Sequence, residues 1–484
     1  MDLGTSSVRA MVFDRRLRPV PGAEAHRPHT PRVSGDGGAE MDPRTILEQV
    51  ASAIDEALQG VAQEPIAGVG VSSFWHGLLA TDQSLKPLTP VLLWSDGRSW
   101  REAQRLRERL DDRAVHRRTG CRLHPSYWPG KIAWLKGRDH RLREPGVRWL
   151  SPSDLLYQHL FGELATSSSL ASGTGLRRLR QPAWDAELLD ALGIAASSLP
   201  EVSDESYGPL KARWRRRWGQ LADATWAPAA GDVGLSNLGS GCLDTRRRAL
   251  SIGTSGAIRV LLKSPPRSLP PSLWCYRAGV DRYVAGGAVS NGGNLHAWLL
   301  DVLKEPETRR PARKPFQHGL TFLPLLAGER GPGYAVRATG AISGLTQATT
   351  AAEILQAGLE GVALQLARLD RDLDRSAPGA ELIVASGAGL LHNRAWMQML
   401  ADATGRPVGA GGAREASARG AAFSAFEAAG LLSENDLARL DPGIRRPLAP
   451  TADPETRNAY ERAWRRQEAL YRAVVSSGRR EAGH

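Results

Sequence analysis

The sequence has few cysteines and no long apolar run. Only Cys121, Cys242 and Cys275 occur among its 484 residues, and their spacing fits neither a CxxC metal site nor a disulfide framework. No apolar stretch reaches the ~18–20 residues of a membrane span. The amino end also lacks the basic-then-apolar pattern of a secretory signal. We therefore expect a cytoplasmic protein in a reducing compartment, with no membrane partner.

Lysine is scarce as well, because only 7 of the 63 cationic residues are lysine, although the formal net charge is +12. A cationic surface can bind nucleic acid by counterion release, and residues 213–218 (Arg-Trp-Arg-Arg-Arg-Trp) interleave aromatic and basic side chains as single-strand binders do. The arginines are spread over the whole chain, however, without a zinc-finger, RRM or KH pattern. We favour a solvated helix whose tryptophans pack inward, and expect no nucleic-acid partner.

The residues that are present predict an α/β protein. Hydrophobic residues make up 42% and charged residues 24%, as in ordinary globular proteins, and the length predicts two or three domains. Residues 8–13 and 66–71 are typical of apolar strands, and residues 46–58 form an amphipathic helical pattern. Residues 249–262 repeat the order of strand, small-residue turn and strand. We expect a duplicated α/β domain, divided into residues 1–243 and 244–484, with a cleft between the halves.

Two small-residue turns are candidate phosphate sites. Each lacks bulk, so that backbone N–H groups and hydroxyls can approach a polyanion, although such turns are often plain hairpins. They are Gly4-Thr5-Ser6-Ser7 and Gly253-Thr254-Ser255-Gly256, at equivalent places in the two halves. Neither is a Walker A loop, since no Gly-Lys-Ser/Thr follows. Nor does the segment from Gly387 to Gly389 complete a dinucleotide-binding pattern.

Two aspartates stand close to small-residue segments. Asp2 precedes the first turn, where a carboxylate can hold a hydrated Mg²⁺ against phosphates or can merely cap the turn. Asp232 lies among small residues at the start of a predicted helix. It can be a structural N-cap, or the carboxylate that accepts the proton of a hydroxyl during phosphoryl transfer. Its place between the two turns favours catalysis.

The order of these motifs resembles the FGGY carbohydrate kinases, a family of the actin-like ATPase superfamily. The resemblance covers nearly the whole chain, and any one match is modest, but their number and order make it specific. The matching segments are residues 2–9, 40–43, 161–163, 171–174, 184–185, 199–200, 231–232, 253–256, 340–345, 353–354, 359–360, 386–389 with Asn393, Trp396 and 401–402, and 415–422.

The resemblance implies two ribonuclease-H-like α/β domains that close over ATP, Mg²⁺ and a sugar. It implies Asp232 as the general base, also in contact with the acceptor, and Asp2 as the metal residue. The residues implied to bind ATP and its phosphates are Gly4, Thr5, Ser6, Ser7, Arg9, Gly253, Thr254, Ser255, Gly387, Ala388 and Asn393. The residues implied to contact the acceptor are Trp75, His76, Asp96, Arg98 and Tyr127. Ordinary packing explains most of the 14 tryptophans.

Within this family the acceptor segments look most like those of the branch that phosphorylates gluconate. The carboxylate of gluconate could pair with Arg98 or His76, although both could equally bind hydroxyls. Xylulose or another pentulose or polyol is the alternative acceptor, and glycerol fits less well with aromatic-rich segments. Other classes of function are an actin-like ATPase switch, an inactive relative, or the nucleic-acid binder above. A homodimer is compatible with the sequence.

Three positions depart from the family pattern. The pattern has an apolar strand before the first aspartate, whereas only Met1 precedes Asp2 here, and we expect this to weaken the placement of the metal and the stability of the domain. Gly358 replaces a larger apolar residue, which would cost roughly 0.5–1 kcal/mol inside a helix. Ser167 stands where an aspartate is frequent.

Overall fold

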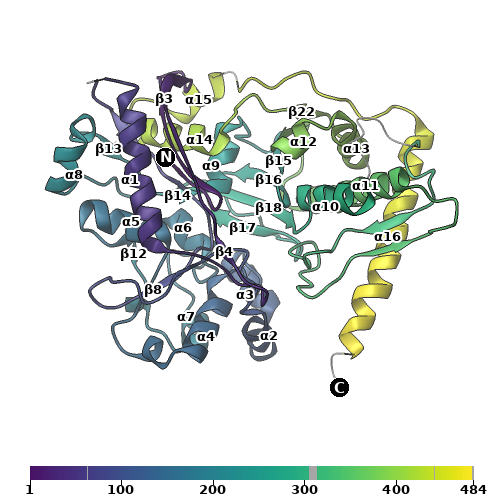
Figure 1. Ribbon diagram of the computed structural model, residues 1–484, viewed down its shortest axis with the longest axis horizontal. Helices are drawn as coiled ribbons and strands as arrows, with labels where there is room; N and C mark the ends of the chain where they lie inside the picture. Colours follow the sequence, from purple (N-terminus) through teal and green to yellow (C-terminus); the bar gives the residue numbers. More distant parts are fainter. Residues whose placement is uncertain (63, 305–312, 441, 482–484) are drawn as a thin grey trace.

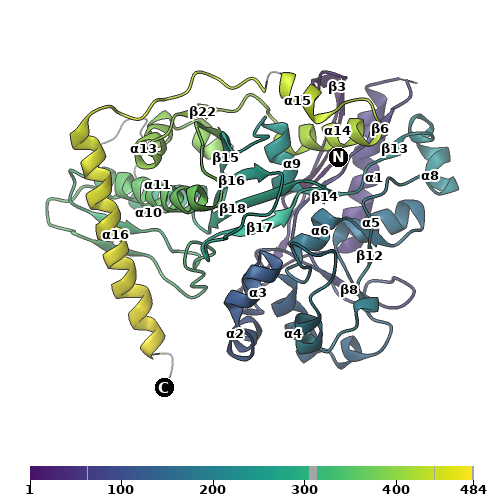
Figure 2. The same ribbon diagram turned by 180° about the vertical axis from the view of Figure 1, so that it is seen from behind.

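A computed structural model describes residues 1–62, 64–304, 313–440 and 442–481 of the chain. Two α/β halves lie side by side, and each is built around its own central sheet (Figures 1 and 2). No helix in the described part is long and apolar enough to cross a membrane.

The first half is rich in short strands. In chain order its elements are β1 (Asp2–Leu3), β2 (Ser7–Phe13), β3 (Pro19–Pro28), β4 (Arg32–Val33), β5 (Ala39–Met41), α1 (Pro43–Gln59), β6 (Gly68–Val69), β7 (Ser72–Ser73), β8 (Leu79–Thr81), β9 (Val91–Leu92), α2 (Trp100–Arg109), α3 (Asp112–Thr119), α4 (Trp128–Arg138), the 3-10 turn η1 (His140–Arg143), β10 (Arg148–Leu150), α5 (Pro152–Phe161), β11 (Ala165–Thr166), α6 (Ser168–Gly173), α7 (Ala186–Leu192), η2 (Ala196–Ser198), β12 (Glu201–Val202), α8 (Ala212–Arg217), η3 (Gly219–Leu221), β13 (Thr225–Trp226), β14 (Ala230–Gly231) and α9 (Asp232–Gly239).

The second half contains longer strands and helices. Its elements are β15 (Arg247–Ile252), β16 (Gly256–Leu262), β17 (Trp274–Arg277), β18 (Tyr283–Val289), α10 (Gly293–Leu303), β19 (Thr321–Leu323), β20 (Ala341–Ser343), α11 (Ala351–Ser376), β21 (Leu382–Ser386), α12 (Ala388–Leu391), α13 (Arg394–Thr404), β22 (Val408–Ala410), α14 (Ala416–Ala428), α15 (Glu434–Arg439) and α16 (Pro454–Glu481).

The two central sheets share one topology. The first has the order β14-β7-β1-β2-β3 and the second the order β17-β18-β16-β15-β21-β22. In each, an antiparallel meander (β1, β2 and β3; β15, β16 and β18) is followed by two strands parallel to its first strand (β7 and β14; β21 and β22). The prediction of two ribonuclease-H-like domains is therefore confirmed.

The amphipathic pattern of the first predicted helix forms α1 as expected. Asp42 caps its amino end by accepting a hydrogen bond from the Arg44 amide, and Pro43 occupies the first turn. The apolar side chains at 46, 50, 54 and 58 are all buried. They pack against the meander and form the largest part of the first core.

Gly358 lies in α11, where it faces the side chain of Leu299. A methyl group at this position would lie 2.4 Å from Cδ1 of Leu299 on α10. The missing side chain of Gly358 therefore lets α10 and α11 approach closely, and a larger residue would require the Leu299 side chain to move. Ser167 caps α6 by accepting a hydrogen bond from the Leu170 amide, and its hydroxyl donates to the carbonyl of Ala229 at 2.5 Å, just before β14. Both departures from the family pattern thus have local structural roles.

Helix α14 crosses from the second half of the sequence to the first half of the molecule (Figures 1 and 2). It packs on α9 at backbone distance, because a Cβ on Gly420 would lie 1.9 Å from the carbonyl oxygen of Leu235. A Cβ on Gly70 would lie 1.8 Å from the carbonyl oxygen of Ala421 on α14. The predicted boundary between residues 243 and 244 falls between the two sheets, but α14 lies with the first sheet.

The arginine-rich segment at 213–218 packs its tryptophans inward. Trp214 stacks on Trp218 with ring centroids 4.6 Å apart, and Trp218 is buried. The indole of Trp218 donates to Asp55, which also pairs with Arg217. This is the arrangement expected of a solvated helix, with the aromatic faces engaged in packing and not open to bases.

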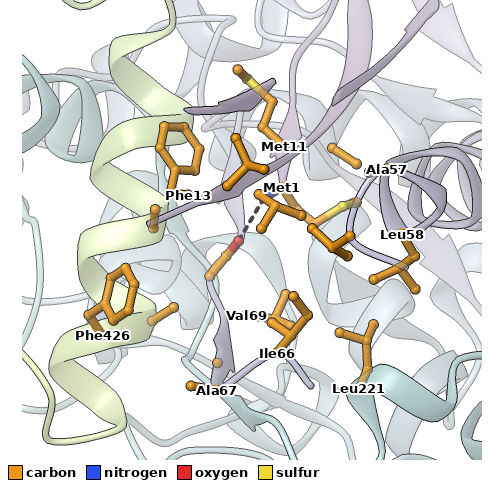
Figure 3. Close-up of a pocket in the computed structure, with 18 of the residues that line it drawn as sticks. Met1, Met11, Phe13, Ala57, Leu58, Ile66, Ala67, Val69, Leu221 and Phe426 are labelled. Carbon is orange, nitrogen blue, oxygen red and sulfur yellow. Dashed lines mark hydrogen bonds between the residues drawn. The ribbon is translucent and has the colours of Figure 1, made fainter. Parts of the chain in front are cut away.

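Of the strand expected over 66–71, only β6 (Gly68–Val69) forms, paired with β13, and β7 follows it at Ser72–Ser73. Pairing between β1 and β2 stops at Asp2 and Arg9. Residues 10–13 of β2 therefore border a groove of about 520 Å³ between β2, α1, β6 and α14. Its walls are largely apolar and include Met11, Phe13, Leu58, Ile66, Val69 and Phe426 (Figure 3).

The amino group of Met1 is buried at one end of this groove. It donates to the carbonyl of Gly70 at 3.0 Å, and burial lowers its pKa to about 6. Placing an amino terminus here is costly because a charged group must be desolvated.

Three apolar residues placed directly before Met1 should stabilise the protein. The β1–β2 register would bring them opposite Met11, Val12 and Phe13. We expect Val-Ile-Val to raise the melting temperature by ~5 °C or more, since each buried side chain contributes more than its ordering costs. A Gly-Ser-Gly extension is the matched control. Equal melting temperatures for the two extensions would contradict the prediction.

Candidate active site

Asp232 stands where β14 ends and α9 begins, at the carboxyl edge of the first sheet. Gly231 is required just before it, because a Cβ there would lie 1.9 Å from Cε2 of Trp75. The Oδ1 atom of Asp232 accepts a hydrogen bond from the Val233 amide at 2.9 Å. Burial raises the pKa of this carboxyl to about 6, and the nearby charge of Asp2 adds to the shift. The carboxyl therefore gains and loses its proton closer to neutral pH than an ordinary aspartate, and its role as general base stays a prediction.

Strand register brings Asp2 to the same edge. Asp2 pairs with Ser72 across β1 and β7, and Ser72 pairs with Ala230 across β7 and β14. The three strands are parallel, so their carboxyl ends meet. Asp2 thus lies two strands from the turn that carries Asp232, and the structure brings the predicted metal residue and the predicted base together.

Arg9 and Glu415 complete this group of charges. Nη1 of Arg9 lies 3.5 Å from a carboxylate oxygen of Asp2 and 3.3 Å from one of Glu415. Burial raises the pKa of Glu415, Arg9 opposes the shift, and the charge of Asp2 adds to it. Glu415 stands directly before α14 and was not predicted as a site residue. Its motif was recognised in the sequence, but only the return of α14 to the first sheet shows that it faces Asp2.

The carboxylates fit a hydrated magnesium ion. The described residues hold no group of three or more His, Cys, Asp or Glu side chains that could bind a metal. Mg²⁺ is commonly held by one or two carboxylates, with water and substrate phosphates as the other ligands. The repulsion between Asp2 and Asp232 would be relieved by a divalent cation. The role of Asp2 in metal binding stays a prediction.

The first predicted phosphate turn is a tight hairpin between β1 and β2. The Gly4 amide donates to the carbonyl of Ser7 at 3.0 Å. Thr5 is half-buried and Ser6 is exposed, so their groups are accessible, whereas Ser7 is buried. A polyanion could thus approach Thr5 and Ser6, whereas the side chain of Ser7 is enclosed, and the phosphate contacts of all three stay predictions.

The second turn joins β15 to β16 and lies against the start of α10. The Gly253 amide donates to the carbonyl of Ser255 at 3.0 Å, and the Gly293 amide donates to the carbonyl of Gly253 at 2.8 Å. A Cβ on Gly293 would lie 2.4 Å from that carbonyl oxygen. Gly253 and Thr254 are exposed. The amino end of α10, which favours anions, thus adjoins the turn, and the Gly292-Gly293 pair was the sequence signal for it.

The predicted adenosine segment adjoins the second turn. Gly387 has a left-handed φ of 92° and a Cβ there would lie 2.2 Å from the carbonyl oxygen of Ile252, which precedes Gly253. Ala388 follows at the start of α12. Asn393 caps α13, because its side-chain oxygen accepts a hydrogen bond from the Trp396 amide at 2.9 Å. That oxygen already has a structural partner, and the contacts of these residues with a nucleotide stay predictions.

Trp75 is buried beside Gly231, and its neighbour His76 is buried as well. Trp75 donates through Nε1 to the carbonyl of Ser169 at 3.0 Å, and Nδ1 of His76 lies 2.5 Å from the carbonyl oxygen of Gly173. His76 has a left-handed φ of 70°, which is strained for a residue with a Cβ. Burial, and then the charge of Arg330, hold the pKa of His76 well below its usual range. The ring is therefore neutral near pH 7.

Tyr127 connects the halves at this place. Its hydroxyl lies 2.6 Å from the hydroxyl of Tyr276 on β17, and its ring is 4.7 Å from that of His76. Tyr276 also contacts Trp75, with ring centroids 4.6 Å apart. The predicted acceptor residues Trp75, His76 and Tyr127 thus form one aromatic cluster, and the second half contributes Tyr276, which sequence reasoning missed.

Asp96 and Arg98 are engaged with each other. Arg98 pairs with Asp96 at 2.6 Å and with Glu40 at 2.8 Å, and the Ala39 amide donates to Asp96 at 3.0 Å. The arrangement holds the segment after β9 against β5. Both oxygens of Asp96 have partners within the protein, so the predicted contacts of this pair with an acceptor stay predictions.

Three further basic residues surround the cluster. The ammonium of Lys131 on α4 is fully buried and donates to the carbonyl of His76 at 2.7 Å, and burial lowers its pKa to about 7. His124 is buried on the segment before Tyr127. Arg330 reaches in from the second half, with its guanidinium carbon 4.7 Å from the centroid of the Trp94 ring. Nothing in the local sequence of Lys131 or Arg330 indicated this placement.

Family models match both halves of the chain. The N-terminal domain of the FGGY family of carbohydrate kinases matches residues 1–239, and the C-terminal domain of that family matches residues 249–429. Gluconokinase of Bacillus subtilis (strain 168) is 28% identical over 90% of this chain and 88% of its own length. Glycerol kinase of Thermus brockianus is 30% identical over 99% of both chains.

Solved structures agree with these matches. A ligand-bound xylulose kinase from Lactobacillus acidophilus has a TM-score of 0.91 and 27% identity, over 99% of this chain and 98% of that chain. A gluconate kinase from the same organism has a TM-score of 0.88 and 26% identity over the same shares. The relatives thus act on more than one acceptor.

Replacing Asp232 with Asn should stabilise the protein above pH 6. Its carboxyl pKa is raised in the folded state from 3.8 to about 6, so the folded state binds the proton more tightly than the unfolded chain. Ionisation therefore costs stability, fully above pH 6 and not at all below pH 4. We expect a melting temperature ~2–5 °C above that of the wild type at pH 7.5, and none of this gain at pH 4. The exposed Asp223→Asn variant is the control, and an unchanged difference across pH would contradict the assignment.

Proposed function

The chain belongs to the FGGY family of carbohydrate kinases, and on this premise we propose that it transfers the terminal phosphate of ATP to a hydroxyl of gluconate, giving 6-phosphogluconate and ADP. The observation that carries the proposal is Asp232. It is a carboxylate with a raised pKa at the edge of the first sheet, next to Asp2 on one side and to the aromatic cluster around Trp75 on the other.

Asp232 acts as the general base in this proposal. A pKa of about 6 leaves the carboxylate ionised at pH 7 yet basic enough to accept a proton in the transition state. It takes the proton of the acceptor hydroxyl while that oxygen attacks the terminal phosphorus, and ADP leaves in line. The small residues around Asp232 leave room for the acceptor.

The two turns supply the phosphate contacts. Thr5, Ser6 and Thr254 offer accessible donors, and Arg9 lies beside Asp2, close to where the transferred group would pass. Mg²⁺ held in a water shell at Asp2 would neutralise phosphate charge when bound. Because the turns belong to opposite halves, closure of the halves brings donor and acceptor together and excludes water.

Gluconate is favoured over other acceptors by the relatives and by the chemistry of the cleft. Two gluconokinases are among the similar proteins, and the basic residues of the cleft suit a carboxylate. Xylulose is the alternative acceptor, because the structure of this chain matches that of a xylulose kinase with a TM-score of 0.91. A homodimer, a cytoplasmic location and the lack of a nucleic-acid partner remain proposals from the sequence.

The Asp232→Asn variant should lose phosphoryl transfer and keep ATP binding. Removing a general base costs ~10²–10⁴-fold in kcat, whereas the phosphate turns are untouched. ADP release is measured with ATP, Mg²⁺ and gluconate, xylulose, glycerol or no acceptor, and ATP affinity is measured by calorimetry. If the variant still transfers phosphate at the wild-type rate, Asp232 is not the general base. Stimulation by xylulose alone would keep the mechanism and replace the acceptor.

The rate should fall in acid because the base becomes protonated. Asp232 must be ionised to accept a proton, so kcat/KM for the acceptor should decline tenfold per pH unit below about pH 6. Saturating Mg·ATP should shift this acid-side decline of the rate to lower pH, because a nearby cation favours the ionised carboxylate. A flat profile between pH 5 and 7 would contradict the assignment.

A further inference from the structure

Basic groups from both halves lie close to the aromatic cluster of Trp75, His76 and Tyr127. The guanidinium of Arg330 forms no ion pair with any residue in the described part of the chain, whereas the buried ammonium of Lys131 is near the charge of Asp96, which opposes the lowering of its pKa. Arg330 is half-buried, and its guanidinium lies over Trp94, a neutral ring. Leaving a cation half-buried without a counter-ion is costly, and a bound anion would remove that cost.

Arg330 is brought to the first half by the segment between β19 and β20. Its backbone amide donates to the hydroxyl of Ser290 at 3.0 Å, which fixes the segment to the end of β18. Tyr334 on the same segment places its ring 5.7 Å from that of His124, edge to face. The segment therefore lies against His124 and Trp94, and the donors come from both halves.

The tautomer of His124 is set by its neighbours. The Ser126 amide donates to Nδ1 of His124 at 3.2 Å, so this nitrogen is an acceptor. Burial, followed by the charge of Arg330, holds the pKa of His124 well below its usual range. A neutral ring whose Nδ1 accepts carries its proton on Nε2. His124 therefore presents an N–H donor that the hydrogen bond to Ser126 leaves free for another partner.

We propose that Arg330 and the Nε2–H of His124 bind the carboxylate of a sugar-acid acceptor, as a subsite distinct from the residues that handle the reacting hydroxyl. This inference rests on the proposed function and names the group that selects its substrate. The planar fork of Arg330 matches the two oxygens of a carboxylate, and a neutral hydroxyl in the same place would leave its charge uncompensated. Lys131 adds positive potential from behind His76.

The Arg330→Gln variant tests the subsite with a charged and a neutral acceptor. Because charge-assisted hydrogen bonds are lost only with a carboxylate, we expect KM for gluconate to rise ~10–100-fold and KM for xylulose to change less than about threefold. His124→Leu should give the same selective loss, and His124→Gln, which keeps an N–H donor, should restore part of it. The control is Arg337→Gln, because Arg337 lies in the same segment over Trp100, with its guanidinium carbon 5.1 Å from the ring centroid, and is exposed.

The outcomes separate this inference from the proposed function. Equal losses for gluconate and xylulose would overturn the carboxylate assignment, as would an unchanged KM for gluconate. Gluconate binding to the full chain is also measured by calorimetry without ATP. If gluconate binds the wild type but not Arg330→Gln, and the wild type transfers no phosphate, the subsite assignment stands and the kinase proposal is overturned. Turnover of xylulose without any binding of gluconate would overturn the subsite and keep the kinase mechanism.

Discussion

The parallel register of β1, β7 and β14 is the constraint on which the rest of the site depends. It places Asp2 opposite Ser72 and Ser72 opposite Ala230, so two carboxylates from residues 230 positions apart come to one sheet edge. Their mutual repulsion contributes to the raised pKa of Asp232. Trp75 follows β7 and fills the space that only Gly231 leaves, so the base and the acceptor cluster are fixed by the same three strands.

Several features of the cleft cost stability and share one place. The charge of Asp2 acts on Asp232, His76 has a strained backbone, Lys131 is buried with a lowered pKa, and Arg330 forms no ion pair within the described structure. Such costs are tolerated where surrounding packing holds the chain, and they concentrate at functional sites. Each would be relieved or used by a bound group: a cation between the carboxylates, and an anion at the basic residues.

The two halves are interdependent, although each has its own sheet. The second half sends α14 back onto the first sheet, and with it Glu415 to the side of Arg9 and Asp2. It also supplies Tyr276 and Arg330 to the acceptor side, while the first half supplies Trp75, His76 and Tyr127. A site assembled in this way is complete only when the halves are close, which couples acceptor binding to domain closure.

The sequence by itself determined what is local or carried by a motif. Periodicity located α1, and apolar runs located β2, β15 and β16. The two glycine turns and the two aspartates could be named from their neighbours, and the order of motifs identified the family. Only the tertiary structure decided which of these residues meet. Arg98 with Glu40, Tyr127 with Tyr276, and Arg330 with Trp94 are pairs separated by 58 to 236 positions. No local pattern encodes such pairs, because strand register, helix packing and the approach of the two halves place them. The pKa of Asp232 belongs to the same category, since it arises from burial and from a charge on another strand.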